Sequence, residues 1–201
     1  AANRDVEGMG LKNTGGYIFY DGNNSQWLDP AKPAAREYLC GLAKEAAELL
    51  QRKIREQKKI RIIGDYDIDG IFATYILYHG LTACGAVADY ALPHRINDGY
   101  GLSEKLIREA CEAGCDTILT CDNGIAAASE IAYAKSLGMT VIVTDHHEVP
   151  LRWEGETSTV VLPEADVVVD PKQPGCTYPF KGICGAVVAW KVLQLLLREL
   201  G

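Results

Sequence analysis

Short apolar runs rich in β-branched residues alternate with segments of helical pattern along most of this chain. The expected strands are KIRIIGD (59–65), AVADYAL (86–92), DTILTC (116–121), MTVIVTD (139–145) and ADVVVD (165–170). Helical patterns lie near 71–84, 103–113, 125–137 and 184–199, and a longer one starts at Pro33. Nearly continuous apolar strands that alternate with helices are typical of a parallel sheet covered on both faces. The sequence therefore predicts an α/β fold with a mostly parallel β-sheet and helices on both faces.

The 201 residues are enough for one substantial domain, and 48% of them are hydrophobic. We expect residues 1–30, rich in Gly, Asn and Asp, to form an irregular segment and residues 31–201 to form the domain. Residues 149–182 should be its longest irregular region. No apolar run is long enough to cross a bilayer, so no membrane partner is expected. The 7 scattered cysteines suit buried thiols in a reducing cytoplasm better than a disulfide framework.

Acidic and imidazole side chains follow four of the five expected strands, where each strand ends. They are Asp65, Asp67 and Asp69 after the first strand, Asp122 after the third, Asp145, His146 and His147 after the fourth, and Asp170 after the fifth. Ligands bind open α/β sheets beyond the carboxyl ends of the strands, so these side chains should meet at one edge. Each has an ordinary explanation: Asp69 could cap a helix, Asp122 could lie in a turn, and Asp170 precedes a proline. Their combination favours a functional site.

Carboxylates gathered within a few ångströms raise one another's pKa unless a cation neutralises them. Histidine among them favours a transition-type divalent ion such as Mn²⁺ over Ca²⁺. The ligands are too many for one ion and suit two, an arrangement that supports in-line displacement at phosphorus. Asp65 and Asp67 can converge because residues two apart in an extended segment share a face. The adjacent His146 and His147 would point in opposite directions if the strand continued.

The net charge of −7 weighs only weakly against a nucleic-acid substrate. Proteins that hold phosphates through bulk electrostatics are usually basic. A dense acidic metal site gives the same formal charge, because the count ignores bound cations.

Three motifs in combination resemble the signature of the DHH phosphoesterase superfamily: GDYDIDG (64–70), CDNGI (121–125) and TDHHE (144–148). Two further stretches, RINDGYGLS (95–103) and VVDPKQPGCTYPFKGICGAVVAWKV (168–192), are similar to its RecJ branch, the 5′→3′ single-strand-specific DNA exonucleases. The resemblance extends from about residue 58 to the end of the sequence. RecJ-like proteins continue into a further segment and a second domain, so the resemblance implies a DHH catalytic domain truncated at its C-terminus.

The resemblance also implies roles for individual residues and a cofactor of two Mn²⁺ or Mg²⁺ ions. The residues expected to ligate metal are Asp65, Asp67, Asp69, Asp122 and His146. Those expected to take part in catalysis are Asp65, Asp67, Asp145 and His147. His147 and Arg95 are expected to bind substrate, although Arg95 could equally be a solvated loop residue. Asp170 falls where the RecJ branch often has Asn, and ranks below the others.

The activity implied is that of a metal-dependent phosphodiesterase, a 5′→3′ single-stranded-DNA exonuclease that releases 5′-mononucleotides by two-metal hydrolysis in DNA repair and recombination. Its expected partners are single-stranded DNA and a single-strand-binding protein or helicase. One alternative is a DHH phosphoesterase that acts on short oligonucleotides, cyclic dinucleotides or pyrophosphate. Another is a non-catalytic replication scaffold with the same fold.

Overall fold

A five-stranded parallel sheet forms the centre of the computed structural model, which describes residues 43–94, 100–155, 157–176, 178 and 180–201. The strand order is β2-β1-β3-β4-β7, and every neighbouring pair is parallel. The strands are β1 (Ile60–Ile63), β2 (Ala88–Ala91), β3 (Thr117–Cys121), β4 (Thr140–Thr144) and β7 (Val167–Val169). Each lies within one of the five expected runs. The predicted fold class is therefore confirmed.

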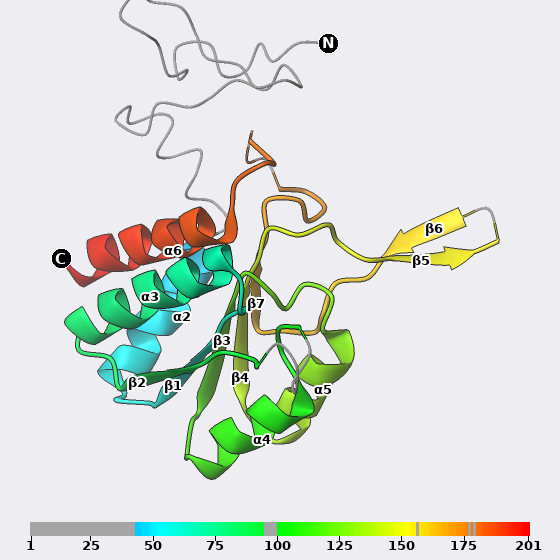
Figure 1. Cartoon of the computed structure of the whole chain (residues 1–201). Coiled ribbons are helices and arrows are strands. Elements are labelled where there is room, and N and C mark those ends of the chain that lie inside the picture. Colours follow the sequence, from blue (N-terminus) through cyan, green and yellow to red (C-terminus); the bar gives the residue numbers. More distant parts are fainter. Residues whose placement is uncertain (1–42, 95–99, 156, 177, 179) are drawn as a thin grey trace, which may run out of the picture.

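Helices cover both faces of this sheet (Figure 1). One face carries α2 (Ala43–Arg55), α3 (Ile68–Ala83) and α6 (Gly185–Leu200). The other carries α4 (Glu104–Glu112) and α5 (Ala128–Ser136). The four helices expected after residue 70 are all present, and α3 begins before the predicted pattern. Residues 1–30 and the expected start of the first helix at Pro33 lie outside the described residues.

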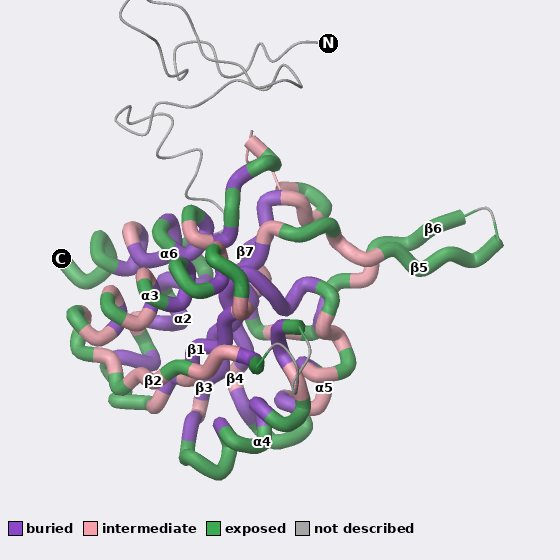
Figure 2. The backbone as a smooth tube through the Cα atoms, in the orientation of Figure 1, coloured by how far each residue is buried: buried purple, intermediate pink, exposed green. Residues whose placement is uncertain are grey.

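Two separate hydrophobic clusters hold these layers together. Alternate side chains of a strand point to opposite faces, so Leu119 packs with α2, α3 and α6 while its neighbour Ile118 packs with α4 and α5. Figure 2 shows the central strands and the inward sides of the helices as buried. Gly80 brings α3 close to α6, because a Cβ there would lie 2.1 Å from Cδ2 of Leu193. Burial from both sides fixes the carboxyl ends of the strands.

A β-hairpin projects from the domain between β4 and β7 (Figure 1). It pairs β5 (Leu151–Glu154) with β6 (Thr157–Val160) in antiparallel register, and all of its described residues are exposed. The prediction of irregular structure over 149–182 was wrong for this hairpin. The two strands of four residues each are too short for their alternating pattern to stand out.

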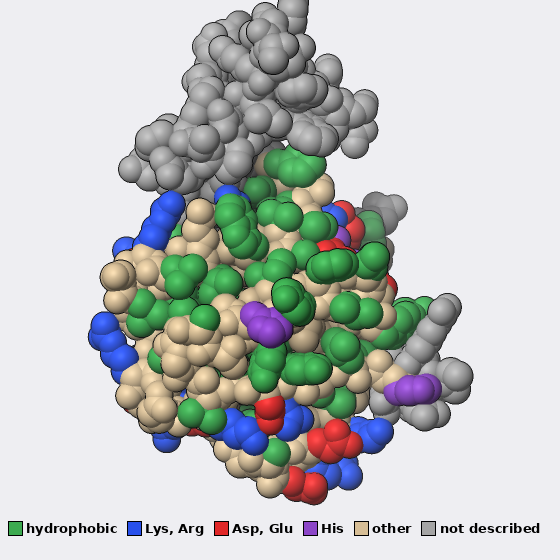
Figure 3. Space-filling view, turned by 60° about the vertical axis from the view of Figure 1, so that its left-hand side comes forward, with side chains coloured by type: hydrophobic (Ala, Val, Ile, Leu, Met, Phe, Trp, Pro, Cys, Tyr) green, Lys and Arg blue, Asp and Glu red, His purple; other side chains and the backbone are tan. Residues whose placement is uncertain are grey.

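Large hydrophobic side chains remain exposed on the outer side of α3 and on the edge strand β2. They include Ile68, Ile71, Phe72 and Tyr75 on the helix and Tyr90 on the strand. Figure 3 shows hydrophobic side chains gathered over this side of the molecule. In the part of the chain that is described, no helix is both long and apolar enough to span a membrane.

Candidate metal centre

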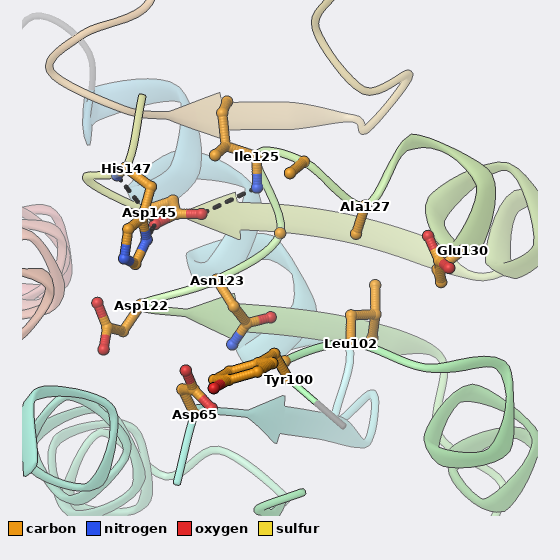
Figure 4. Close-up of a pocket in the computed structure, with 13 residues that line it drawn as sticks. Asp65, Tyr100, Leu102, Asp122, Asn123, Ile125, Ala127, Glu130, Asp145 and His147 are labelled. Atoms are coloured by element: carbon orange, nitrogen blue, oxygen red, sulfur yellow. Dashed lines mark hydrogen bonds and ion pairs between the residues drawn. The ribbon is translucent and has the colours of Figure 1, made fainter. Parts of the chain in front are cut away.

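The carboxyl ends of β1, β3, β4 and β7 bring the predicted acidic and imidazole residues to one edge of the sheet. Figure 4 shows Asp65, Asp122, Asp145 and His147 around a common space at this edge. β1 leads into Asp65, β3 into Asp122, and β4 into Asp145. The parallel order of the strands therefore places together residues that lie far apart in the sequence.

Asp122 is the buried centre of this group. Its side chain is 2% exposed, and its backbone has a φ of 62°, in the left-handed region that Asp tolerates better than most residues. Its Oδ1 atom is buried without a well-directed hydrogen-bond donor in the described part of the chain. His146 Nε2 lies 3.0 Å from that oxygen and 3.5 Å from Oδ2 of Asp69. A Cβ on Gly185 would lie 2.5 Å from Asp122 Oδ1, so glycine is needed where α6 begins.

The pKa values of this pair move in the same direction for different reasons. Burial raises the pKa of Asp122, and the contact with His146 opposes that rise. The contact with Asp122 raises the pKa of His146 against the opposing effect of burial. A positive charge on His146 favours the buried carboxylate of Asp122, as a metal cation at the same place would.

Asp145 holds the backbone that carries both histidines. Its Oδ2 accepts a hydrogen bond from Ile125 N at 2.9 Å, and its Oδ1 accepts from His146 N at 2.7 Å. Oδ1 also lies 2.7 Å from Nδ1 of His147. Burial alone would raise the pKa of Asp145, but the hydrogen bonds from His147, Ile125 and His146 outweigh it and lower the pKa. The same contact raises the pKa of His147 to about 9.

The two histidines do not point in opposite directions, contrary to the expectation for a continuing strand. β4 ends at Thr144, and Asp145 turns the chain by accepting bonds from the backbone N–H groups of His146 and His147. The two rings lie 4.5 Å apart between centroids, with an interplanar angle of 47°. The His146 ring thus contacts the carboxylate of Asp122, and the His147 ring contacts the carboxylate of Asp145.

Asp67 and Asp69 each accept hydrogen bonds at a helix N-terminus. Asp67 is the N-cap of α3, where its Oδ1 accepts from Gly70 N at 2.9 Å. Asp69 instead caps α6: its carboxylate accepts from Gly185 N at 2.7 Å and from Ala186 N at 2.8 Å. The interpretation of Asp69 as the cap of its own helix was wrong. Each carboxylate thus supplies an acceptor to backbone N–H groups that have no partner within the first turn of a helix.

Asp65 and Asp170 lie at the margins of the group. Asp65 lines the pocket described below, and its Oδ1 accepts from Tyr66 N at 2.7 Å. Asp170 is fully buried; its Oδ1 accepts from Lys172 N at 2.7 Å, and its Oδ2 has no partner among the described residues. Burial raises the pKa of Asp170 to about 6. Arg95 lies outside the described residues, so its predicted role stays a prediction.

The donor set suits a divalent cation. Asp122, His146 and His147 each offer one ligand atom, and these atoms lie within 4.8 Å of one another. Mixed carboxylate and imidazole donors fit Mn²⁺ or a related ion better than Ca²⁺. A buried carboxylate oxygen without a well-directed donor is costly unless a cation or proton meets it. The residues present therefore fit a metal ion.

A cavity of about 350 Å³ opens beside the donor set (Figure 4). Its walls include three lining residues that sequence reasoning did not single out: Tyr100, Asn123 and Ile125. Asn123 follows Asp122 directly in the CDNGI motif, so its position next to the site could have been found. Tyr100 and Ile125 reach the cavity from loops, whose course no local pattern predicts.

Comparison with known proteins identifies similar sequences. The model of the DHH family, N-terminal domain, matches residues 59–201. The chain is 45% identical over 157 residues to the single-stranded-DNA-specific exonuclease RecJ of Bacillus subtilis (strain 168), covering 78% of this chain and 19% of that protein. It is 37% identical over 169 residues to the protein of the same name from Escherichia coli (strain K12), covering 82% of this chain and 28% of that protein.

Solved structures give the same result. A crystal structure of exonuclease RecJ bound to manganese matches with a TM-score of 0.68 at 37% identity, over 81% of this chain and 39% of that one. RecJ in complex with Mn²⁺ from Thermus thermophilus matches with a TM-score of 0.62 at 34% identity, over 81% of this chain and 22% of that one. The chain therefore spans less than half the length of each of these relatives.

Proposed function

The chain belongs to the DHH family, and we propose that it is a metal-dependent phosphodiesterase that degrades single-stranded DNA from the 5′ end and releases 5′-mononucleotides. The observation that carries the proposal is the approach of His146 Nε2 to the buried Oδ1 of Asp122 at 3.0 Å. The relatives' description as single-stranded-DNA-specific exonucleases supports the substrate class. The manganese bound to two RecJ structures supports the cofactor.

The proposed cofactor is a pair of Mn²⁺ or Mg²⁺ ions. The residues that would hold them are Asp65, Asp67, Asp69, Asp122 and His146. A cation between Asp122 and His146 would take the place of the proton that otherwise stabilises the carboxylate. The hydrogen bonds to Asp67 and Asp69 leave lone pairs on both carboxylates, since an ionised carboxylate has about four acceptor sites. Such ions supply a nucleophile by lowering the pKa of water and stabilise charge on the phosphate.

His147 is proposed to contact the scissile phosphate, and Asp145 is proposed to orient it. Asp145 is buried and held by the backbone N–H groups of Ile125 and His146, so it cannot move to follow the imidazole. Its contact with Nδ1 fixes the ring and leaves Nε2 free of that bond. Because His147 lines the cavity, a phosphate at the metal end of the cavity would lie within its reach.

The test is Mn²⁺-dependent release of mononucleotides by this chain from single-stranded DNA labelled at its 5′ end. A labelled dinucleotide and a blunt duplex serve as parallel substrates. We expect release from the 5′ end of the single strand and little from the duplex. Cleavage of the dinucleotide alone would favour the small-substrate alternative, and no cleavage of any substrate in Mn²⁺ would contradict the proposal. Association with a single-strand-binding protein or a helicase stays a prediction from the resemblance.

A further inference from the structure

The side-chain amide of Asn123 has a fixed orientation. Its Nδ2 donates to Ile63 O at 3.0 Å and to Cys121 O at 2.9 Å, so it ties the ends of β1 and β3 together. A flipped amide would set its oxygen against both carbonyl oxygens and lose both bonds. Gly101 packs against the side chain from another side, because a Cβ there would lie 2.9 Å from Cβ of Asn123. The Oδ1 atom must therefore point away from these two carbonyl groups.

Among the described residues, no donor reaches the buried Oδ1 atom of Asn123. The residue is 9% exposed, and its side-chain oxygen is buried. Asn123 lines the cavity, and Figure 4 shows its side chain between Asp65 and Leu102, with the oxygen on the side of Leu102. A buried acceptor held in this way is costly unless a ligand supplies the missing donor.

The two ends of the cavity differ in chemistry. The carboxylates and the imidazole of the candidate metal centre lie at one end, where a phosphate would have to sit. Away from that end the lining includes the apolar side chains of Leu102, Ile125 and Ala127, and the carboxylate of Glu130 lies beyond Ala127. A cavity of about 350 Å³ is of the size that binds a small organic ligand, and the apolar side chains next to the fixed acceptor of Asn123 suit a planar base better than a sugar phosphate.

We propose that Asn123 is a positioning residue whose Oδ1 accepts a hydrogen bond from an N–H group on the Watson–Crick edge of the nucleotide held at the metal centre. This inference rests on the proposed function. Every DNA base carries at least one N–H on that edge, so the contact tolerates any sequence. In a duplex those groups are already paired with the other strand. The acceptor therefore favours an unpaired terminal nucleotide, as enzymes that read extruded bases do.

The test compares two ligands that differ by one donor. Calorimetric titration in Mn²⁺ measures the affinity of the chain for 2′-deoxyadenosine 5′-monophosphate and for the analogue whose base is unsubstituted purine, which lacks the 6-amino group. We expect the analogue to bind about tenfold more weakly, the loss typical when a buried acceptor is left unpaired. Equal affinities would overturn the inference, and would mean that any donor comes from the sugar or the solvent.

Asn123→Ala supplies the second comparison. We expect the variant to bind both ligands with the same affinity, close to the affinity of the unaltered chain for the analogue. If Asn123 had only a structural role, the substitution would lower the affinity for both ligands by the same factor, and the difference between them would remain. Retained discrimination would overturn the inference. If the variant does not fold, the ligand pair on the unaltered chain still decides. If neither ligand binds the unaltered chain, the inference about Asn123 is also wrong. If, in addition, the chain does not hydrolyse DNA, the proposed function is contradicted. Equal binding of the two ligands by a chain that still hydrolyses DNA would overturn only the inference about Asn123.

Discussion

The carboxylate of Asp69, in the first turn of α3, accepts a hydrogen bond from the backbone N–H of Gly185, 116 residues away at the start of α6. The same Oδ2 atom lies 3.5 Å from Nε2 of His146. One side chain thus closes the N-terminus of a distant helix and faces the candidate metal centre. The metal-ligand role proposed for Asp69 would therefore couple metal binding to the stability of α6.

Asp69→Ala should lower the free energy of unfolding by about 1–2 kcal/mol, because α6 loses its only side-chain cap among the described residues. Urea denaturation of the metal-free protein measures the change. Glu164→Ala, at an exposed acidic residue, is the matched control and should change stability by less than about 0.5 kcal/mol. Equal losses in the two variants would show that Asp69 does not support α6.

Substitutions of Asp67 separate its two roles. Asp67→Ala should cost about 1 kcal/mol of stability because α3 loses its N-cap, while Asp67→Ser should retain the cap. Both variants lose the carboxylate, so both should reduce Mn²⁺-dependent hydrolysis of single-stranded DNA by about a hundredfold or more. Denaturation and the nuclease assay are run on the same preparations. Hydrolysis at the original rate by the serine variant would remove Asp67 from the set of metal ligands.

The stability of the metal-free protein should fall as pH rises from about 4 to above 6, through Asp170. The pKa of Asp170 in the folded state, about 6, exceeds the ordinary value, so ionisation is less favourable in the folded state than in the unfolded state. The resulting loss of stability is absent at low pH, where Asp170 is protonated in both states, and complete above the folded pKa. Asp170→Asn should therefore stabilise the protein by roughly 1–3 kcal/mol at pH 8 and give no gain at pH 4. Unfolding free energies at the two pH values check this. A gain of the same size at both would assign the effect to packing instead of charge.

The fold could be predicted from the sequence because each central strand is a nearly continuous apolar run buried on both faces. The meeting of Asp65, Asp122 and Asp145 at one edge followed from the parallel order of those strands. What the sequence could not show depends on distant contacts. No local pattern reveals that the carboxylate of Asp69 accepts a hydrogen bond from Gly185 N. Asp67, and not Asp69, caps α3 because the helix starts at Ile68, a boundary that the sequence does not define.

The orientation of the histidines and of Asn123 was missed for a similar reason. His146 and His147 turn together because Asp145 accepts their backbone N–H groups, a bond that ends the strand. Asn123 has its role because β1 and β3 lie side by side and offer it two carbonyl oxygens. The hairpin β5–β6 was missed because its strands have only four residues each, too few for an alternating pattern to stand out.

Asp122 and His146 are proposed to hold a divalent ion, and a titration with Mn²⁺, in which electron paramagnetic resonance measures the free ion, tests this proposal. Asp122→Asn is the informative variant, because Asn also tolerates a positive φ and should fold. We predict that the unaltered chain and the surface control Glu164→Gln bind two ions, and that Asp122→Asn binds Mn²⁺ at least tenfold more weakly. Unchanged Mn²⁺ affinity and stoichiometry in a folded Asp122→Asn variant would show that Asp122 does not ligate the ion.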